Sequence, residues 1–207
     1  GNYLMPGLIG SFMKAHTGAK LTLDVANTRH VIRQIEQFQA DIGFIEGFCH
    51  EPNIEAIPWQ HDELVIFAAS SHPLAVQKTV TEDDLAQADW ILREHGSGTR
   101  EIFDNAILGK VRHINILLEF GHTEAIIHAV STGIGIGCAS KLTLAAALKG
   151  GSIVALPTPY LDLHRELYLL IHQQKYRTYG LERFLQHCQA SVTSLAPSSH
   201  MIDRTKS

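Results

Sequence analysis

The sequence predicts an α/β protein built from two units in which helices and strands alternate. Along residues 1–46, segments with apolar residues at helical spacing alternate with segments in which every second residue is apolar. A second alternation of this kind begins at residue 89. The pattern changes around residues 52–75 and again around 157–165. Alternation of this kind is typical of a parallel sheet covered by helices. The two changes indicate two lobes with a chain that crosses between them.

The first unit is predicted to run helix, strand, helix, strand. Apolar residues recur at a spacing of four from Leu4 to Phe12, which predicts a helix. Leu21, Leu23 and Val25 alternate with polar residues, which predicts a strand. The expected elements are a helix over residues 4–17, a strand over 20–26, a helix over 27–39 behind an Asn27 or Thr28 cap, and a strand over 41–46.

The second unit follows a stretch of different character. Two strand-like runs, residues 54–60 and 63–70, are joined by the polar "HDE", and "SSHPLA" then interrupts the chain. Beyond it we expect strands over 89–94, 114–120, 134–139, 152–157 and 165–173, and helices over 99–109, 123–131 and 141–148. A last amphipathic helix is expected around Leu181, Phe184, Leu185 and Cys188.

Composition weighs against several classes of protein. The 17 basic and 21 acidic residues are well mixed and give a net charge of −4, so no basic face is expected to bind nucleic acid. No apolar run approaches the roughly 18 residues of a membrane-spanning helix, and the first residues do not resemble a signal peptide. Cys49, Cys138 and Cys188 are odd in number and far apart, which favours a reducing cytoplasm over a disulfide framework.

Four loops that are expected to follow a strand and open a helix are rich in hydroxyl and amide side chains. Such loops meet at one edge of a parallel sheet, where free N–H groups at helix starts favour an anion. Taken singly, most of these residues are explained as helix caps. Because the loops come from both units, we expect a shared small polar or anionic ligand. The residues expected to contact it are Asn2, Tyr3, Asn27, Thr28, Gly96, Ser97, Gly98, Thr99, Arg100, His122, Thr123 and Glu124.

Two glycine-rich stretches do not fit nucleotide-binding loops. "HGSGTR" at 95–100 lacks the GxxxxGK[ST] spacing and its Lys, and "TGIGIGC" at 132–138 lies between a helix and a strand, the wrong order for a dinucleotide loop. Arg100 and Arg29 are the expected charge partners of an anion through bidentate donors. Either arginine is equally consistent with a solvated charge on a helix face.

Catalysis and metal binding are not expected. Ser97 lacks the GxSxG flanks of a nucleophile elbow. The 13 histidines show no HExxH or similarly compact spacing, so neither a metal nor another cofactor is predicted. A small α/β enzyme would need an acid–base pair in the cleft, and Glu124 with His122 is the pair that this alternative would use.

The chain resembles a known family in the order and spacing of four short stretches. "ADIGFIEG" (40–47), "HPLA" (72–75), "DWILREHGSGTRE" (89–101) and "AVSTGIGIG" (129–137) resemble the effector-sensing domain of LysR-type transcriptional regulators, from residue 1 to about residue 190. The resemblance implies two Rossmann-like subdomains joined by two crossing strands, as in type 2 periplasmic binding proteins. It also implies an effector in the cleft between them.

The resemblance also implies boundaries for the two subdomains. Residues 1–70 and 163–190 would form subdomain I, and residues 71–162 would form subdomain II. Residues 191–207 are polar, lack a periodic apolar pattern and are expected to form a flexible tail. The family's first ligand loop matches this chain only at its end, in Gly1, Asn2 and Tyr3.

Partners are implied in the same way. The effector would be a small anion such as a sulfur oxyanion or a carboxylate metabolite. The domain would form a homodimer or homotetramer through the helix at 4–17 and the helix at 124–131. DNA would be bound through an N-terminal winged helix-turn-helix that is absent from this chain, with the protein in the cytoplasm and no membrane partner. A periplasmic-type solute-binding protein for a small anion is the alternative with the same architecture.

Overall fold

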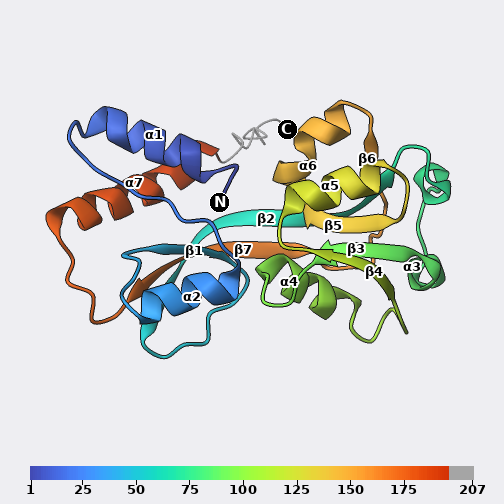
Figure 1. Ribbon diagram of the computed structural model, residues 1–207, viewed down its shortest axis with the longest axis horizontal. Helices are drawn as coiled ribbons and strands as arrows, with labels where there is room; N and C mark the ends of the chain where they lie inside the picture. The colour runs from blue at the N-terminus through green and yellow to red at the C-terminus, as the bar shows by residue number, and fades with distance from the viewer. Residues whose placement is uncertain (196–207) are drawn as a thin grey trace, which may run out of the picture.

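The computed structural model describes residues 1–195 and shows two lobes joined by long strands (Figure 1). The predicted alternation of helices and strands is confirmed, and one helix, at 123–131, has the predicted bounds. In chain order the elements are α1 Met5–Ala15, α2 Thr28–Glu36, β1 Gly43–Glu46, β2 Ile54–Ala69, the 3-10 helix η1 Pro73–Val76, α3 Glu82–Gln87, β3 Asp89–Arg93, α4 Gly98–Ile107, β4 Asn115–Phe120, α5 Thr123–Ser131, β5 Ile136–Ser140, α6 Lys141–Lys149, β6 Ile153–Ala155, β7 His164–His172 and α7 Tyr179–Leu195.

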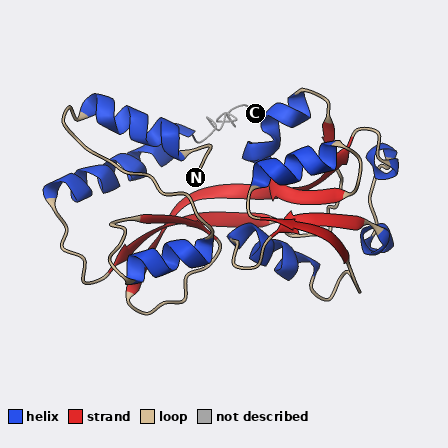
Figure 2. Cartoon of the chain, viewed as in Figure 1, coloured by secondary structure: helices blue, strands red, loops and turns tan. Residues whose placement is uncertain are grey.

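Each lobe is a sheet with helices on both faces (Figures 1 and 2). In lobe I, α1 and α7 lie on one face of β1, β7 and the first part of β2, and α2 lies on the other. In lobe II, α5 and α6 lie on one face of β3, β4, β5 and the second part of β2, and α4 lies on the other. This is the predicted type 2 periplasmic-binding-protein-like architecture. The division of the chain at residues 71 and 163 stays a prediction.

The long strand β2 joins the lobes. Its residues 54–63 pair antiparallel with β7, and its residues 64–68 pair antiparallel with β5. The prediction of two strands separated by "HDE" is therefore wrong. Those three polar residues stay in the ladder opposite Glu166, Arg165 and His164. They are tolerated within the strand because the side chains facing them across the ladder are able to carry the opposite charge.

The parallel strands of lobe II end at the edge that faces lobe I. β3 lies between β4 and β5 and is parallel to both, and its central residues Trp90, Ile91 and Leu92 are fully buried. α4, α5 and α6 begin a few residues or less after β3, β4 and β5. Since parallel strands share the direction of their carboxyl ends, the N-termini of these three helices gather at one edge.

The strand predicted over residues 20–26 is not formed. Leu21, Leu23 and Val25 lie in an extended segment and are 37–42% exposed. Alternation supplies an apolar face, but a strand also needs a neighbour that bonds its backbone, and no described strand pairs with this segment. The pattern therefore correctly predicted an extended backbone, but the prediction that this segment is a strand of the sheet is wrong.

Two short helices and one helix end differ from the sequence-based expectations. η1 and α3 were not predicted, although α3 begins with a Thr81–Asp84 capping box that the sequence displays. α7 continues to Leu195, so residues 191–195, assigned to the tail, are helical. The rest of the predicted tail, residues 196–207, lies outside the described residues.

Candidate functional site

A cavity of about 990 Å³ opens where the two lobes meet. The predicted contact residues Gly96, Thr99 and Arg100 are not part of its lining. All four predicted loops nevertheless reach this one cavity, and contact with a ligand stays a prediction. The predicted residues that line it are Asn2, Tyr3, Asn27, Thr28, Ser97, Gly98, His122, Thr123 and Glu124.

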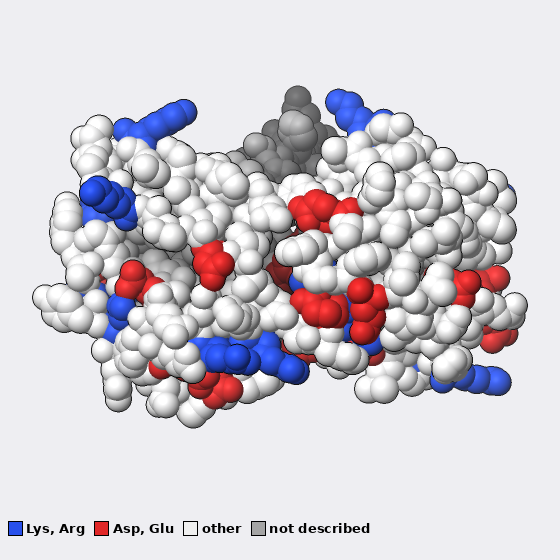
Figure 3. Space-filling model, in the orientation of Figure 1, with Lys and Arg blue, Asp and Glu red and all other residues white. Residues whose placement is uncertain are grey.

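The cavity has two parts. One lies in lobe I and is lined by α1, the extended segment 20–26 and β1. The other, which we call the interlobe cleft, carries most of the polar groups of interest, and acidic side chains surround the hollow there (Figure 3). The interlobe cleft is lined by Asn27, Thr28, Glu46, Asp62, Arg93, Glu94, Ser97, Gly98, His122, Thr123, Glu124, Ser140, Thr143 and Arg165.

The loop before α4, residues 95–99, is in direct contact with lobe I. The Gly98 N–H donates to the Thr28 hydroxyl at 3.2 Å, and the Arg29 N–H donates to the Gly96 carbonyl oxygen at 3.1 Å. A Cβ added at Gly98 would lie 1.6 Å from the Glu46 carbonyl oxygen, so only glycine fits at this position. This α4 loop therefore holds the two lobes together at one side of the cleft.

Ser97 is buried at the start of α4, yet its hydroxyl makes no hydrogen bond. The residue is 2% exposed and lines the interlobe cleft. It occupies the cap position of α4 without a side-chain cap bond, and no other residue within 1–195 bonds its hydroxyl. Asn27 and Ser140, in contrast, do cap α2 and α6. The hydroxyl oxygen itself is open to the cleft, since among residues 1–195 the buried side-chain polar atom without a partner is Tyr160 Oη. A free hydroxyl beside a helix N-terminus indicates a place for a polar ligand group.

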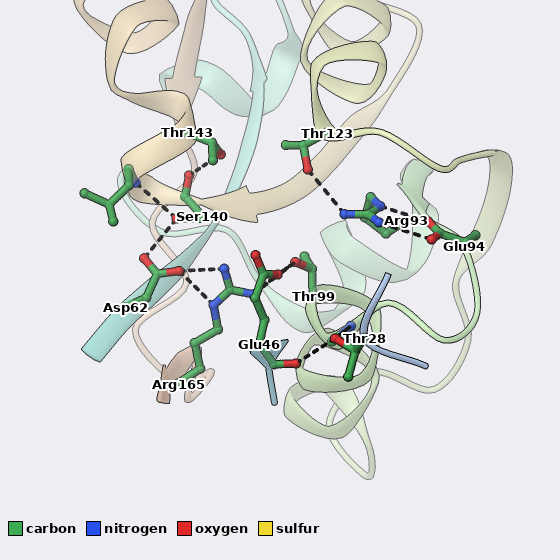
Figure 4. A network of polar contacts seen from close by, with 12 residues as sticks. Thr28, Glu46, Asp62, Arg93, Glu94, Thr99, Thr123, Ser140, Thr143 and Arg165 are labelled. Atoms are coloured by element: carbon green, nitrogen blue, oxygen red, sulfur yellow. Dashed lines mark hydrogen bonds and ion pairs between the residues drawn. The ribbon is translucent and has the colours of Figure 1, made fainter. Parts of the chain in front are cut away.

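Arg165 and Asp62 form a buried ion pair at the base of the cleft (Figure 4). Their side chains are 2% and 3% exposed, and Nε and Nη2 of Arg165 lie 2.7 Å and 2.6 Å from Asp62 Oδ2. The Ser140 hydroxyl donates to the other carboxylate oxygen at 2.9 Å. The pair connects both crossing strands to the start of α6. The sequence motifs did not identify Arg165 and Asp62, although a charged residue within each apolar strand was an available signal.

Glu46 connects this pair to the α4 loop. Arg165 Nη1 donates to Glu46 Oε2 at 2.8 Å and to the Thr99 hydroxyl oxygen at 3.0 Å, and the Thr99 hydroxyl donates to Glu46 Oε2 at 2.7 Å. Burial raises the pKa of the Glu46 carboxyl, but the Arg165 charge and the Thr99 hydrogen bond outweigh burial and lower it below its ordinary value. Glu46 is therefore charged at neutral pH, and Thr99 is occupied by the contact between the lobes.

Arg100 points away from the interlobe cleft. Its guanidinium donates to Asp104 at 2.9 Å, to the Arg93 carbonyl oxygen at 3.0 Å and to Glu119, and its side chain is 6% exposed. Arg29, the second predicted charge partner, is also absent from the lining. The ion pairs with two carboxylates account for the position of Arg100 without a ligand.

Arg93, which our sequence analysis did not single out, lines the cleft instead (Figure 4). Its Nε and Nη2 donate to the two oxygens of Glu94 at 2.8 Å and 3.1 Å, and its Nη1 lies 3.5 Å from the Thr123 hydroxyl. Asn27 of lobe I donates to Glu94 at 3.1 Å. Burial raises the pKa of the Glu94 carboxyl, but hydrogen bonds from Arg93 and Asn27 outweigh burial and lower it. The place of Arg93 at the carboxyl end of β3 was the signal that would have identified it.

The loop before α5, residues 121–124, lines the cleft without closing it. His122 makes no side-chain cap bond to α5, and a Cβ added at Gly121 would meet nothing within 4 Å. Asn2 donates to Glu124 Oε1 at 3.2 Å. Glu124 and His122, the acid–base pair of the enzyme alternative, are not hydrogen-bonded to each other in the described part of the chain.

The remaining features of the described chain concern membranes, metals and thiols. Within residues 1–195, no helix is long and apolar enough to cross a membrane, and no group of three or more His, Cys, Asp or Glu could hold a metal ion. Cys49, Cys138 and Cys188 are free thiols. Burial raises the pKa of Cys138 and of Cys188 to about 12, so both stay protonated at neutral pH.

The two lobes, the crossing strands and the polar cleft between them define a ligand-binding domain of the type 2 periplasmic-binding-protein-like fold. A family model described as "LysR substrate binding domain" matches residues 1–193. The chain therefore belongs to this family, and the resemblance stated above is confirmed.

Curated relatives carry names of transcriptional regulators. The chain is 42% identical over 188 residues to "Uncharacterized HTH-type transcriptional regulator YeiE" of Escherichia coli K12, which covers 91% of this chain and 64% of that protein. It is 32% identical over 167 residues to "HTH-type transcriptional regulator CysL" of Bacillus subtilis, which covers 81% of this chain and 56% of that protein. The chain thus spans less than two thirds of the length of these relatives.

Solved structures support the same architecture. The CcmR regulatory domain of Synechocystis PCC6803 in complex with 2-PG matches with a TM-score of 0.86 and 25% identity, over 94% of this chain and 93% of that one. The effector-binding domain of QuiR in complex with shikimate matches with a TM-score of 0.82 and 22% identity, over 94% and 93% of the two chains. At 22% identity, the similarity to QuiR shows a shared fold alone.

Proposed function

We propose that this chain is the effector-sensing and oligomerising part of a LysR-type transcriptional regulator in the cytoplasm, and that it is not an enzyme. The family match and the relatives named as transcriptional regulators support this function over the alternative of a periplasmic-type solute-binding protein. The net charge of −4 offers no basic face, so we assign DNA binding to a winged helix-turn-helix outside residues 1–207.

The proposed effector is a small anion, such as a sulfur oxyanion or a carboxylate metabolite, bound in the interlobe cleft without a cofactor. The observation that carries this proposal is the Ser97 hydroxyl, which lines the cleft at the N-terminus of α4 without a hydrogen bond to the described chain. A helix N-terminus carries a partial positive charge and free N–H donors, which suit a compact anion. The neutral carboxamide of a carboxylate metabolite lacks the negative charge that the helix N-terminus favours.

Binding of the effector in the cleft would change how the two lobes, or the subunits of the oligomer, are arranged. The effector must bind one arrangement more tightly than the other for any signal to arise. We infer that the domain pairs with a second copy through α1 and α5, as a homodimer or homotetramer. Met13 of α1 is an exposed apolar side chain suited to such a contact. Light scattering at tens of micromolar checks this inference, and a strict monomer would contradict it.

The ligand proposal is tested by a thermal-shift and calorimetric screen of sulfite, sulfate, thiosulfate, phosphate and small carboxylates. A ligand present at 100 times its Kd should stabilise the domain by about 2.7 kcal/mol. Ser97→Ala should weaken that ligand about tenfold, because one hydrogen bond to a charged group is lost. Ser152→Ala is the matched control, since Ser152 is exposed and lies outside the cavity lining. Equal affinities for Ser97→Ala and the unmodified chain would contradict the assignment of the site.

A further inference from the structure

Few cations are placed to meet an anion in the interlobe cleft. Arg93 and Arg165 are the arginines of residues 1–195 that line the cavity. Lys20 and Lys175 also line it, beside the extended segment and residues of β1 in lobe I, and Lys175 is paired with Asp41. Among the lysines and arginines of the described chain, the choice of a charge partner for a ligand in the cleft is therefore between Arg93 and Arg165.

Of the five N–H groups of Arg165, at most one, on Nη2, has no acceptor. Its Nε and Nη2 are bonded to Asp62, and its Nη1 is shared between Glu46 and Thr99. Two carboxylates already compensate its single positive charge, and its side chain is 2% exposed. An anion at Arg165 would have to break a buried network of charges, which is unfavourable. Arg165 therefore stabilises the contact between the two lobes.

Arg93 differs in both charge and geometry. One carboxylate, that of Glu94, faces its Nε and Nη2, while Nη1 makes only the 3.5 Å contact with the Thr123 hydroxyl. A guanidinium has five N–H groups in a planar fork, so the edge that carries Nη1 keeps donors for another acceptor. The side chain is 13% exposed and is held in one orientation by Glu94, which is in turn bonded by Asn27.

We propose that Arg93 is the specificity-determining cation of the cleft, and that its Nη1 edge and the Thr123 hydroxyl together bind the oxyanion or carboxylate group of the effector. Glu94 orients the guanidinium and, as a neighbouring negative charge, lowers the affinity for the anion. This inference rests on the proposed function, and it replaces Arg100 and Arg29 as the expected charge partners.

Replacement of Arg93 and replacement of Glu94 should therefore change the affinity for the anion in opposite directions. Arg93→Gln should weaken the binding of sulfite, sulfate or phosphate by about 50-fold, and Arg93→Lys by about 10-fold, because an ammonium keeps the charge but loses the planar fork. Glu94→Gln should strengthen binding about fivefold, because it removes a like charge near the anion while an amide oxygen still accepts from Arg93. A purely structural ion pair would give weaker binding in both cases.

Isothermal titration calorimetry of the four proteins with sulfite, sulfate and phosphate is the test, with Arg29→Gln as the control. Arg29 is exposed and outside the lining, so its replacement should leave the Kd unchanged. Circular dichroism and unliganded Tm values establish that each variant is folded, and Arg93→Lys keeps the test valid if Arg93→Gln fails to fold.

The outcomes separate this inference from the proposed function. If an anion binds the unmodified chain and Ser97→Ala weakens it, but Arg93→Gln and Arg93→Lys bind within twofold of the unmodified chain, Arg93 has no such role and the proposed function still stands. Weaker binding by Glu94→Gln overturns the opposing role given to Glu94. If none of these anions nor any small carboxylate binds the unmodified chain, both proposals fail.

Discussion

The α4 loop and the α5 loop follow the neighbouring parallel strands β3 and β4, and both combine glycine, threonine and glutamate at the start of a helix. In the α4 loop, Gly98 is packed against the Glu46 carbonyl oxygen, and the Thr99 hydroxyl is bonded to Glu46 and Arg165. In the α5 loop, Gly121 has open space around it, and the Thr123 hydroxyl has one 3.5 Å contact. Similar local sequences thus hold the lobes together in one case and leave polar groups free for a ligand in the other.

The difference arises from what lies opposite each loop. The α4 loop meets the N-terminus of α2 and the end of β1 at close range, where only a glycine allows the backbones to approach. The α5 loop meets the first residues of the chain only through side chains, where Glu124 interacts with Asn2 and Tyr3. The position of a loop after a strand therefore predicts that it lies at the cleft, and the opposing lobe decides what it does there.

The largest expected effect is that of a methyl group in the α4 loop. Gly98→Ala places a Cβ on a backbone oxygen that cannot rotate away, so the lobes must separate, at a cost of about 3 kcal/mol in the free energy of unfolding. Gly121→Ala, the matched change in the α5 loop, should alter it by less than about 0.5 kcal/mol. Urea denaturation measures both. Equal effects of the two changes would contradict the distinction between the loops.

A smaller effect is expected from the two threonines. Thr99→Val removes a hydroxyl that is bonded to Glu46 and Arg165 in a buried site, which should lower the free energy of unfolding by about 1–2 kcal/mol. Thr123→Val should leave stability almost unchanged and should instead weaken anion binding. Chemical denaturation and calorimetry of both variants check this. A stability loss for Thr123→Val as large as that for Thr99→Val would show that the α5 loop also has a structural role.

The smallest effect is expected in the pH dependence of stability. The pKa values of Glu46 and Glu124 are both lowered from the ordinary value of 4.5; burial opposes this in each case, and for Glu46 the nearby Arg165 and Thr99 outweigh it. A lowered carboxyl pKa contributes stability that is fully present above the pKa of the unfolded chain and is lost as the pH falls through the folded-state pKa. The contribution of these two glutamates to stability should therefore be constant from pH 7 to about 5 and fall below it.

The two glutamates should differ in that fall. Glu46→Gln should reduce the acid dependence more than Glu124→Gln, because the Glu124 side chain is exposed and its interactions are screened by solvent. Urea midpoints between pH 7 and pH 3 measure the slopes for both variants and the unmodified chain. A steeper acid dependence in Glu46→Gln than in the unmodified chain would contradict the assigned sign.

Much of the fold could be predicted from the sequence because it depends on local chemistry. The apolar periods identified most of the helices and strands, and the α5 helix has the bounds that the sequence predicts, 123–131. The cap of α2 was predicted at Asn27 or Thr28, and the hydrogen bond from the His30 N–H identifies Asn27 as the cap. The order and spacing of "ADIGFIEG", "HPLA", "DWILREHGSGTRE" and "AVSTGIGIG" predicted the family, and the order of the loops predicted one shared cleft.

Tertiary structure alone decided which of these residues are free to bind a ligand. Residues 20–26 are extended in agreement with their pattern, but no described strand pairs with them. Arg100 on α4 and Arg93 at the end of β3 are joined by a hydrogen bond, and tertiary packing turns Arg100 toward Glu119 of β4 and leaves Arg93 in the cleft. Sequence determines such local conformations through propensity and caps. The partner of a buried charge is set by chain segments far away in sequence, as Glu46 and Arg165 show.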